Sequence, residues 1–153
     1  MHMDIKDAKQ GVEELGVVFD KFGKAPMESR VFACLLLSDP PYRSFQEIVD
    51  FLGASKSAIS NALSNLQKEG TVTYRTFSGD RKRYFEVSTE GWRKSILDRA
   101  TQIGAINNTL RKVLQFRKDS EYKEMNAELE KILQFQMHLS TVIERCIREW
   151  DFK

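Results

Sequence analysis

Small hydroxyl and amide side chains recur at helical spacing near the middle of this chain. Serine and asparagine are poor helix formers, so a helix face built from them is unfavourable if it only has to be soluble. Their short side chains reach phosphates and base edges, and asparagine pairs with adenine through two hydrogen bonds. The competing interpretation is an ordinary solvated face. We favour a DNA-reading face made of Ser55, Lys56, Ser57, Ser60, Asn61, Ser64 and Asn65.

Three adjacent basic residues follow shortly after this face, beside a Ser-Gly-Asp turn at residues 78–80. β-prone residues on both sides, within 71–87, predict a hairpin with this turn at its tip. Basic side chains on a hairpin suit phosphate or minor-groove contact, whereas the alternative is an edge hairpin kept soluble by charge. The predicted DNA contacts of the hairpin are Ser78, Arg81, Lys82 and Arg83.

Strand alternation predicts that Arg81 and Arg83 point to one side of the hairpin and Lys82 to the other. We also expect the neighbouring carboxylate of Asp80 to pair with an arginine and position it.

The elements that must hold these side chains form a helix-turn-helix within residues 44–70. Ser44 and Glu47 have the spacing of a capping box, which starts the first helix. Gly53 suits the turn, where a positive φ is often needed, and Ser55 caps the second helix. Followed by the basic hairpin, this unit is a winged helix.

Helical periodicity extends on both sides of this unit. A first helix is predicted over 4–22, a second through 26–37, and two long helices over 92–114 and 122–150. One small winged helix cannot bury such long apolar stripes, so the long helices and the first one are expected to form a homodimer. The expected class is mainly α (α+β), with segments 1–24 for dimerisation, 25–90 for DNA binding and 91–153 for dimerisation.

The charge distribution agrees with this interpretation. Residues 54–94 contain eight basic and four acidic residues, a net charge of +4, while the whole chain carries +2 and the remainder therefore −2. Positive charge is thus concentrated where phosphate contacts are predicted. With 41% hydrophobic and 30% charged residues, no secretory signal and no apolar run long enough to cross a bilayer, we expect a cytoplasmic protein.

No catalytic constellation is visible, so we predict neither enzyme activity nor a cofactor. The two cysteines, Cys34 and Cys146, lie far apart in apolar surroundings and are interpreted as packing residues. His138 with Cys146 has no metal-site spacing, so no metal is expected.

At this point the residues are similar to those of a known family. Residues 22–92 resemble the MarR superfamily, and more closely its GbsR-type branch, through FGKAPMESRVFACLLLSDPP, EIVDFLGASKSAISNALSNLQKEG and YFEVSTEGW. The resemblance covers about half of the chain directly. It implies a homodimeric winged helix that binds a pseudo-palindromic operator in double-stranded DNA, usually as a repressor and often released by a small-molecule effector. By it, residues 55–65 match the recognition helix and 78–83 the wing.

The sequence therefore predicts a sequence-specific transcriptional regulator. Two alternatives remain open at this point. One is a winged-helix module that binds protein instead of DNA, with the long helices as its partner surface. The other is a thiol-based redox sensor on the same fold, which would need an accessible cysteine of low pKa.

Overall fold

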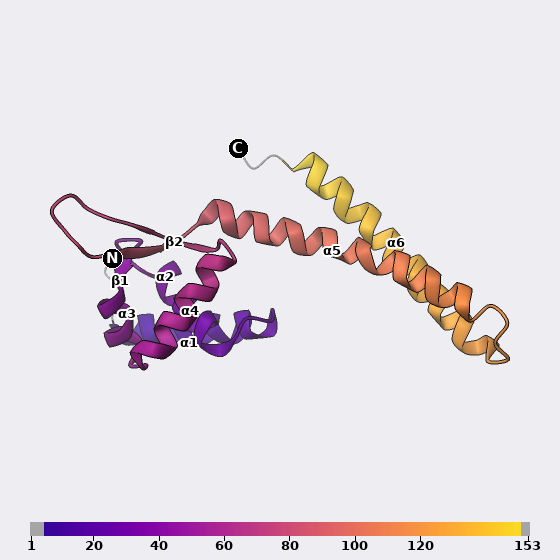
Figure 1. Ribbon diagram of the computed structural model, residues 1–153, viewed down its shortest axis with the longest axis horizontal. Helices are drawn as coiled ribbons and strands as arrows, with labels where there is room; N and C mark the ends of the chain where they lie inside the picture. The colour runs from indigo at the N-terminus through magenta and orange to yellow at the C-terminus, as the bar shows by residue number, and fades with distance from the viewer. Residues whose placement is uncertain (1–4, 151–153) are drawn as a thin grey trace. The chain divides into compact units, whose positions relative to one another are not determined.

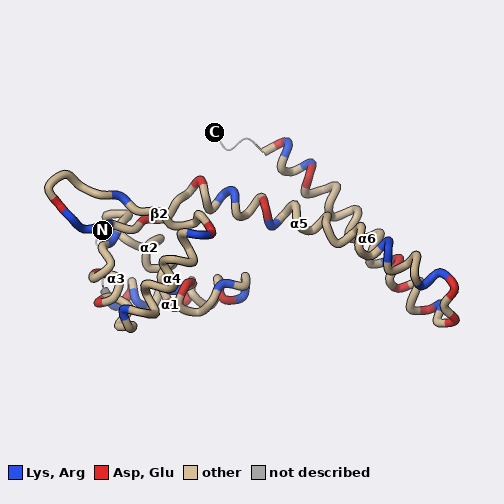
Figure 2. Tube along the Cα trace, in the orientation of Figure 1, with Lys and Arg blue, Asp and Glu red and all other residues tan. Residues whose placement is uncertain are grey.

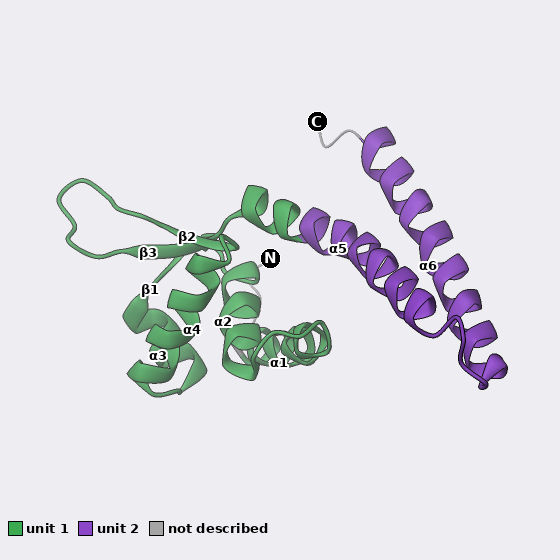
Figure 3. Ribbon diagram, turned by 45° about the vertical axis from the view of Figure 1, so that its right-hand side comes forward, with its two compact units in different colours: residues 1–95 green, residues 96–153 purple. Residues whose placement is uncertain are grey.

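Two compact units make up the chain, residues 1–95 and 96–153 (Figure 3). The computed structural model describes residues 5–150, so the first four and last three residues of the predicted terminal segments lie outside the described residues. The described elements are α1 (Ile5–Lys21), α2 (Pro26–Leu36), β1 (Arg43–Ser44), α3 (Phe45–Leu52), α4 (Lys56–Lys68), β2 (Val72–Arg75), β3 (Tyr84–Val87), α5 (Thr89–Phe116) and α6 (Lys123–Glu149) (Figure 1). This is the predicted mainly helical winged-helix fold, with a small antiparallel sheet.

The helix-turn-helix of the first unit forms as its local sequence predicts. Ser44 caps α3: its hydroxyl accepts a hydrogen bond from the Glu47 N–H, and its own N–H donates to the Glu47 carboxylate. Gly53 ends α3 with a φ of 62°, which a residue with a Cβ rarely adopts. These two ends set the direction in which the chain enters α4.

The three-stranded sheet has the order β1-β3-β2, with both pairs antiparallel. The strands of the hairpin were predicted, but β1 was not. It has only two residues, Arg43 and Ser44, which pair with Phe85 and Tyr84 of β3. Two residues are too few to show an alternating pattern, and Ser44 was interpreted only as a helix cap.

The core of the first unit lies between α2, α3, α4 and the sheet, around fully buried Phe32, Ile48, Ile59 and Leu66. Trp92, in the first turns of α5, packs edge-on against Phe32 with ring centroids 5.3 Å apart. Its contacts show that it belongs to this core.

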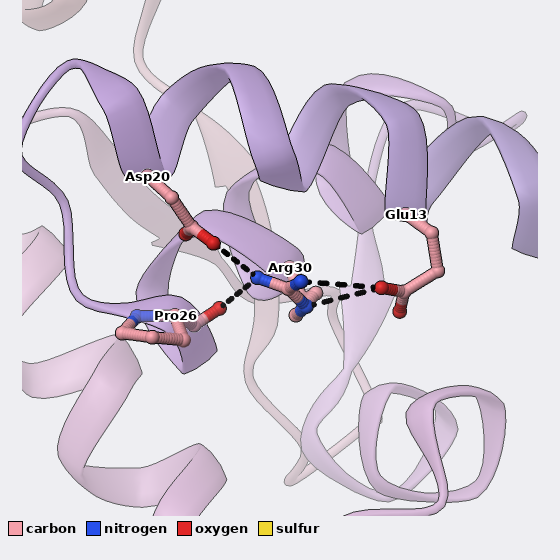
Figure 4. Close-up of polar contacts among 4 residues, drawn as sticks. All are labelled: Glu13, Asp20, Pro26 and Arg30. Atoms are coloured by element: carbon pink, nitrogen blue, oxygen red, sulfur yellow. Dashed lines mark hydrogen bonds and ion pairs between the residues drawn. The ribbon is translucent and has the colours of Figure 1, made fainter.

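α1 packs against α2 through apolar contacts and through one polar cluster. Val12 is buried against Ala33 and Cys34. Arg30 of α2 donates to the Asp20 carboxylate at 2.9 Å and to Glu13 at 3.2 Å (Figure 4). The neighbouring Ser29 hydroxyl and then the Arg30 guanidinium hold the pKa of Asp20 below its usual value.

The start of α5 lies tightly against the turn after α4. The Ser88 N–H donates to the Thr71 carbonyl at 2.9 Å, and Thr71 is fully buried. A Cβ placed on Gly91 would lie 1.8 Å from the carbonyl oxygen of Gly70, which is well inside van der Waals contact. Only glycine at position 91 allows this approach of the two backbones.

The second unit is formed by the rest of α5 and by α6, which were both predicted as long helices. The Asn107 amide donates to the Ser140 hydroxyl at 3.2 Å, and Arg117 donates to Asn126 at 2.9 Å near the connection between the helices. Large apolar side chains remain exposed on this unit, including Ile106, Ile132 and Phe135. Within residues 5–150, none of the helices combines the length and apolarity needed to cross a membrane.

Candidate nucleic-acid interface

The α4 helix has one buried and one exposed face. Ser55 caps it, accepting a hydrogen bond from the Ala58 N–H at 3.2 Å. Its apolar residues Ile59, Ala62, Leu63 and Leu66 are buried in the core. Because these four fix the rotation of the helix about its own axis, the polar positions must turn outward.

The structure brings the predicted contact residues to the surface of one unit. All of them are exposed, which is a precondition for contact with DNA; the contact itself stays a prediction. They are, on and just before α4, Ser55, Lys56, Ser57, Ser60, Asn61, Ser64 and Asn65, and, between β2 and β3, Ser78, Arg81, Lys82 and Arg83.

Three of these side chains on or just before α4 have partners within the chain. The Asn65 amide nitrogen donates to the Glu28 carboxylate of α2 at 2.7 Å. The hydroxyls of Ser55 and Ser57 lie 3.2 Å apart, within hydrogen-bonding distance. Sequence reasoning found neither contact, and it did not single out Glu28 at all.

Besides the Asn65–Glu28 hydrogen bond, the C-terminal end of α4 makes a second contact, with the segment that precedes α2. Glu69, the C-cap of α4, forms an ion pair with Lys24. The Lys24 side chain is only 6% exposed, and its ammonium also lies 5.4 Å from the centre of the Phe32 ring. This cation offsets the unfavourable placement of a carboxylate at a helix C-terminus.

The loop between β2 and β3, residues 76–83, is here called the wing (Figure 1). Three rings hold its base: Phe77 lies 5.1 Å from Tyr84 and 5.3 Å from Tyr42, measured between ring centroids. Tyr42 and Tyr84 are 5.6 Å apart and nearly perpendicular. Sequence reasoning did not assign this cluster, although an aromatic residue beside a polar turn was a signal that could have indicated it.

The prediction that Asp80 pairs with an arginine was wrong. Its carboxylate does not pair with an arginine; it accepts hydrogen bonds from the Lys82 N–H at 2.9 Å and from the Tyr84 hydroxyl at 2.7 Å. These bonds, led by the one from Lys82, hold the pKa of Asp80 below its usual value, and the bond from Tyr84 raises the pKa of that phenol. Asp80 therefore shapes the wing backbone instead of orienting a cation.

The alternation predicted for the three basic residues assumed a strand, but all three precede β3 and lie in the wing loop (Figure 2). The guanidinium of Arg83 lies over the Tyr74 ring at 4.7 Å from its centre. Arg75 of β2 pairs with Glu86 and lies over Tyr42, so its charge is largely used within the sheet. Arg81, Lys82 and Arg83 thus place three exposed positive charges next to one another in the wing.

The two cysteines have opposite environments. Cys34 is buried, and this burial raises the pKa of its thiol to about 11. Cys146 of α6 is exposed.

Across residues 5–150 there is no group of three or more His, Cys, Asp or Glu residues that could hold a metal ion.

Among curated proteins, this chain is similar to the HTH-type transcriptional regulator MmpR5 of Mycobacterium tuberculosis (strain ATCC 25618 / H37Rv), with 30% identity over 81 residues. The match covers 53% of this chain and 49% of MmpR5, so the chain spans about half the length of this relative. No protein-family model matches the chain.

One solved structure, described as a transcriptional regulator, shares the fold over nearly the whole chain. It superposes with a TM-score of 0.65 at 21% identity, over 92% of this chain and 95% of that one. A putative MarR family transcriptional regulator from Listeria monocytogenes, solved in complex with 26mer DNA, has a TM-score of 0.43 at 13% identity, covering 100% and 99% of the two chains. Only the first of these similarities is high enough to support the fold.

Proposed function

We propose that this chain is a sequence-specific, DNA-binding transcriptional regulator of the MarR superfamily. The observation that supports this most strongly is the joint exposure, in one unit, of a Ser- and Asn-rich face on α4 and a basic wing held by Asp80 and the Tyr42–Phe77–Tyr84 rings. A helix with such a face suits the major groove, and a basic hairpin suits phosphates and the minor groove. The similarity to MmpR5 over the matched half supports the same function.

In this proposal, the wing supplies affinity and α4 supplies discrimination. Arg81, Lys82 and Arg83 neutralise phosphates, a contribution that does not depend on base sequence and weakens with salt. Asn61 and its neighbours on α4 contact base edges. The N-terminus of α4, with Lys56 in its first turn, adds a phosphate contact through backbone N–H groups.

We further propose a homodimer, in which α1, α5 and α6 provide the contacts. The exposed apolar residues of α6, among them Ile132 and Phe135, support it because large apolar surfaces are unfavourable in water. Two recognition helices would then enter successive major grooves about 34–36 Å apart on a pseudo-palindromic site. Membership of the GbsR-type branch, repression and release by a small-molecule effector are finer parts of the proposal, supported by the sequence resemblance. A cytoplasmic location is a further part, supported by the two free cysteines.

The function is tested by fluorescence anisotropy of the purified chain with the duplex upstream of its own gene and with a scrambled duplex, at low and moderate salt. Tighter binding to the native duplex, with two chains per duplex, supports the full proposal. Equal and steeply salt-dependent binding to both duplexes supports DNA binding and places the operator elsewhere. An absence of binding even at low salt contradicts the proposal and favours a protein-interaction module.

The dimer is tested separately by light scattering after size exclusion. The wild-type chain should have twice its monomer mass of 17.7 kDa. Phe135→Glu should shift the mass toward the monomer, because it places a charge on the apolar stripe of α6. Gln134→Glu, on the neighbouring exposed residue, adds the same charge off the stripe and should leave the mass unchanged. A monomeric wild type at micromolar concentration contradicts this part.

A further inference from the structure

Glu28 lies in the first turn of α2, outside the elements predicted to read DNA, yet it contacts one of them. Its carboxylate accepts a hydrogen bond of 2.7 Å from the side-chain nitrogen of Asn65 on α4. A carboxylate only accepts, so the Asn65 amide must turn its nitrogen, and not its oxygen, toward Glu28. The contact therefore fixes which way round the amide lies.

The orientation matters because of what it leaves available. An asparagine amide has two N–H hydrogens and one carbonyl oxygen, and Glu28 takes one of the hydrogens. One N–H and the Oδ1 oxygen remain, and this donor–acceptor pair is what recognises the N7 and N6 edge of adenine in the major groove. An amide that is free to rotate would have to be ordered on binding, which costs conformational entropy.

We propose that Glu28 is a positioning residue for Asn65 and, through it, a determinant of which base the recognition helix prefers. The proposal rests on the proposed function, because it needs α4 to enter the major groove. It goes further by assigning specificity to a carboxylate on another helix.

Glu28 is well placed to hold this position. α2 begins at Pro26, and the next residue in the helix after Glu28, Ser29, is fully buried, so its first turn is anchored in the core. A second contact joins the same two segments. It is the ion pair between Lys24, which lies four residues before Glu28, and Glu69, which lies four residues after Asn65. These two contacts together hold the start of α2 in a fixed position against the end of α4.

Asn61 offers a contrast on the same helix face. Within residues 5–150, no hydrogen bond of this kind holds its amide. If both asparagines read bases, only the reading by Asn65 should depend on a residue of α2. This difference makes the proposal testable against a general effect of altered charge near DNA.

The test starts from a duplex that the wild type selects from a random pool, with each base pair of its site then replaced in turn. Asn65→Ala and Glu28→Ala should lose discrimination at the same base pair, by about tenfold, which lies within the range of one bidentate base contact. Glu28→Gln keeps an acceptor but also offers a donor, which permits the reversed amide, so it should retain the discrimination only in part. The double variant should be no less selective than Asn65→Ala alone.

The matched control is Asp50→Ala, which removes an exposed carboxylate that accepts an amide hydrogen bond from Gln46 within α3. It should leave discrimination unchanged at every position. Circular dichroism and melting establish that each variant folds. Glu28→Met, which keeps the side-chain length without an acceptor, replaces Glu28→Ala if the latter does not fold.

Two results overturn the inference while leaving the proposed function intact. One is that Asn65→Ala loses discrimination at a base pair where Glu28→Ala and Glu28→Met keep it. The other is that Asn65→Ala changes discrimination nowhere. A wild type that selects no sequence from the pool contradicts the proposed function itself, and the inference with it.

Discussion

The Tyr84 hydroxyl donates a 2.7 Å hydrogen bond to the Asp80 carboxylate, across the point where the wing enters β3. Because Asp80 also accepts from the Lys82 N–H, one carboxylate fixes both the backbone of the basic run and its distance from the sheet. The position of the wing thus depends on a residue of the opposite charge to those proposed to contact DNA.

Loss of this bond should weaken DNA binding without altering sequence preference. Tyr84→Phe removes only the hydroxyl and should lower affinity for every duplex by about five- to tenfold, which corresponds to roughly 1 kcal/mol, the net contribution of a typical intramolecular hydrogen bond. Asp80→Ala should have at least this effect. Anisotropy titrations with a selected and a scrambled duplex measure it, and a change confined to one of the duplexes would count against a purely positional role.

The capping box at the start of α3 predicts a pH-dependent contribution to stability. Hydrogen bonds from the Ser44 hydroxyl and N–H hold the pKa of Glu47 below its usual value of 4.5. The folded pKa is depressed, so the stabilisation is complete above the unfolded value and is lost as pH falls through the lower folded value. Glu47→Gln should therefore lower the free energy of unfolding by about 1 kcal/mol at pH 7, a usual magnitude for a cap.

Urea unfolding of wild type and Glu47→Gln at pH 7 and at pH values below about 4 checks this, since the carboxyl titrates in that range. The difference between the two proteins should shrink toward acid pH. Other carboxyls titrate in both proteins and cancel in the comparison. A difference that stays constant over this range would show that the carboxylate does not hold the cap.

Gly91 and Gly104, both in α5, should respond oppositely to alanine. At position 91 a Cβ would lie 1.8 Å from the Gly70 carbonyl oxygen, whereas at 104 the nearest atom, the Ser140 hydroxyl oxygen, is 3.6 Å away. Gly91→Ala should destabilise the first unit by about 2–3 kcal/mol through overpacking. Gly104→Ala should be neutral or stabilise by about 0.5–1 kcal/mol through helix propensity.

Denaturant unfolding of Gly91→Ala and Gly104→Ala measures the change in the free energy of unfolding that each substitution causes. Equal effects on the free energy of unfolding would mean that the close approach of α5 to the turn after α4 is not maintained in solution.

The thiols should differ in reactivity. The raised pKa of Cys34, about 11, keeps its thiol protonated at neutral pH, and its burial blocks reagents. Cys146→Ser should therefore leave no thiol that reacts with an aromatic disulfide reagent under native conditions, and one thiol after unfolding. Rapid native labelling of that variant, or a peroxide response of its DNA binding, would revive the thiol-sensor alternative at Cys34.

Local signals in the sequence predicted much of the first unit. The capping box of Ser44 and Glu47, the positive φ of Gly53 and the outward face around Asn61 each follow from neighbours within one or two helical turns. The hairpin strands were also predicted, because their alternation is local.

Two of the contacts that were not predicted join residues far apart in the sequence. Asn65 and Glu28 are 37 residues apart, and the Tyr42–Phe77 contact also joins distant segments. No periodicity shows such pairs. The partner of Asp80 was missed for a different reason, since an arginine next in sequence was preferred to a backbone N–H and a tyrosine four residues away. Contacts that refine the candidate site thus depend on the tertiary fold, while its exposed face does not.

In the proposed function, α4 supplies sequence discrimination and the wing supplies affinity. This assignment is tested most directly by comparing Asn61→Ala with Arg83→Ala on a selected duplex and its scrambled counterpart over a range of salt concentrations. We predict that Asn61→Ala loses discrimination by about tenfold and keeps the wild-type salt dependence. Arg83→Ala should weaken binding to both duplexes alike and reduce the slope of log affinity against log salt by about one. Unchanged affinity, discrimination and slope in both variants would contradict the account.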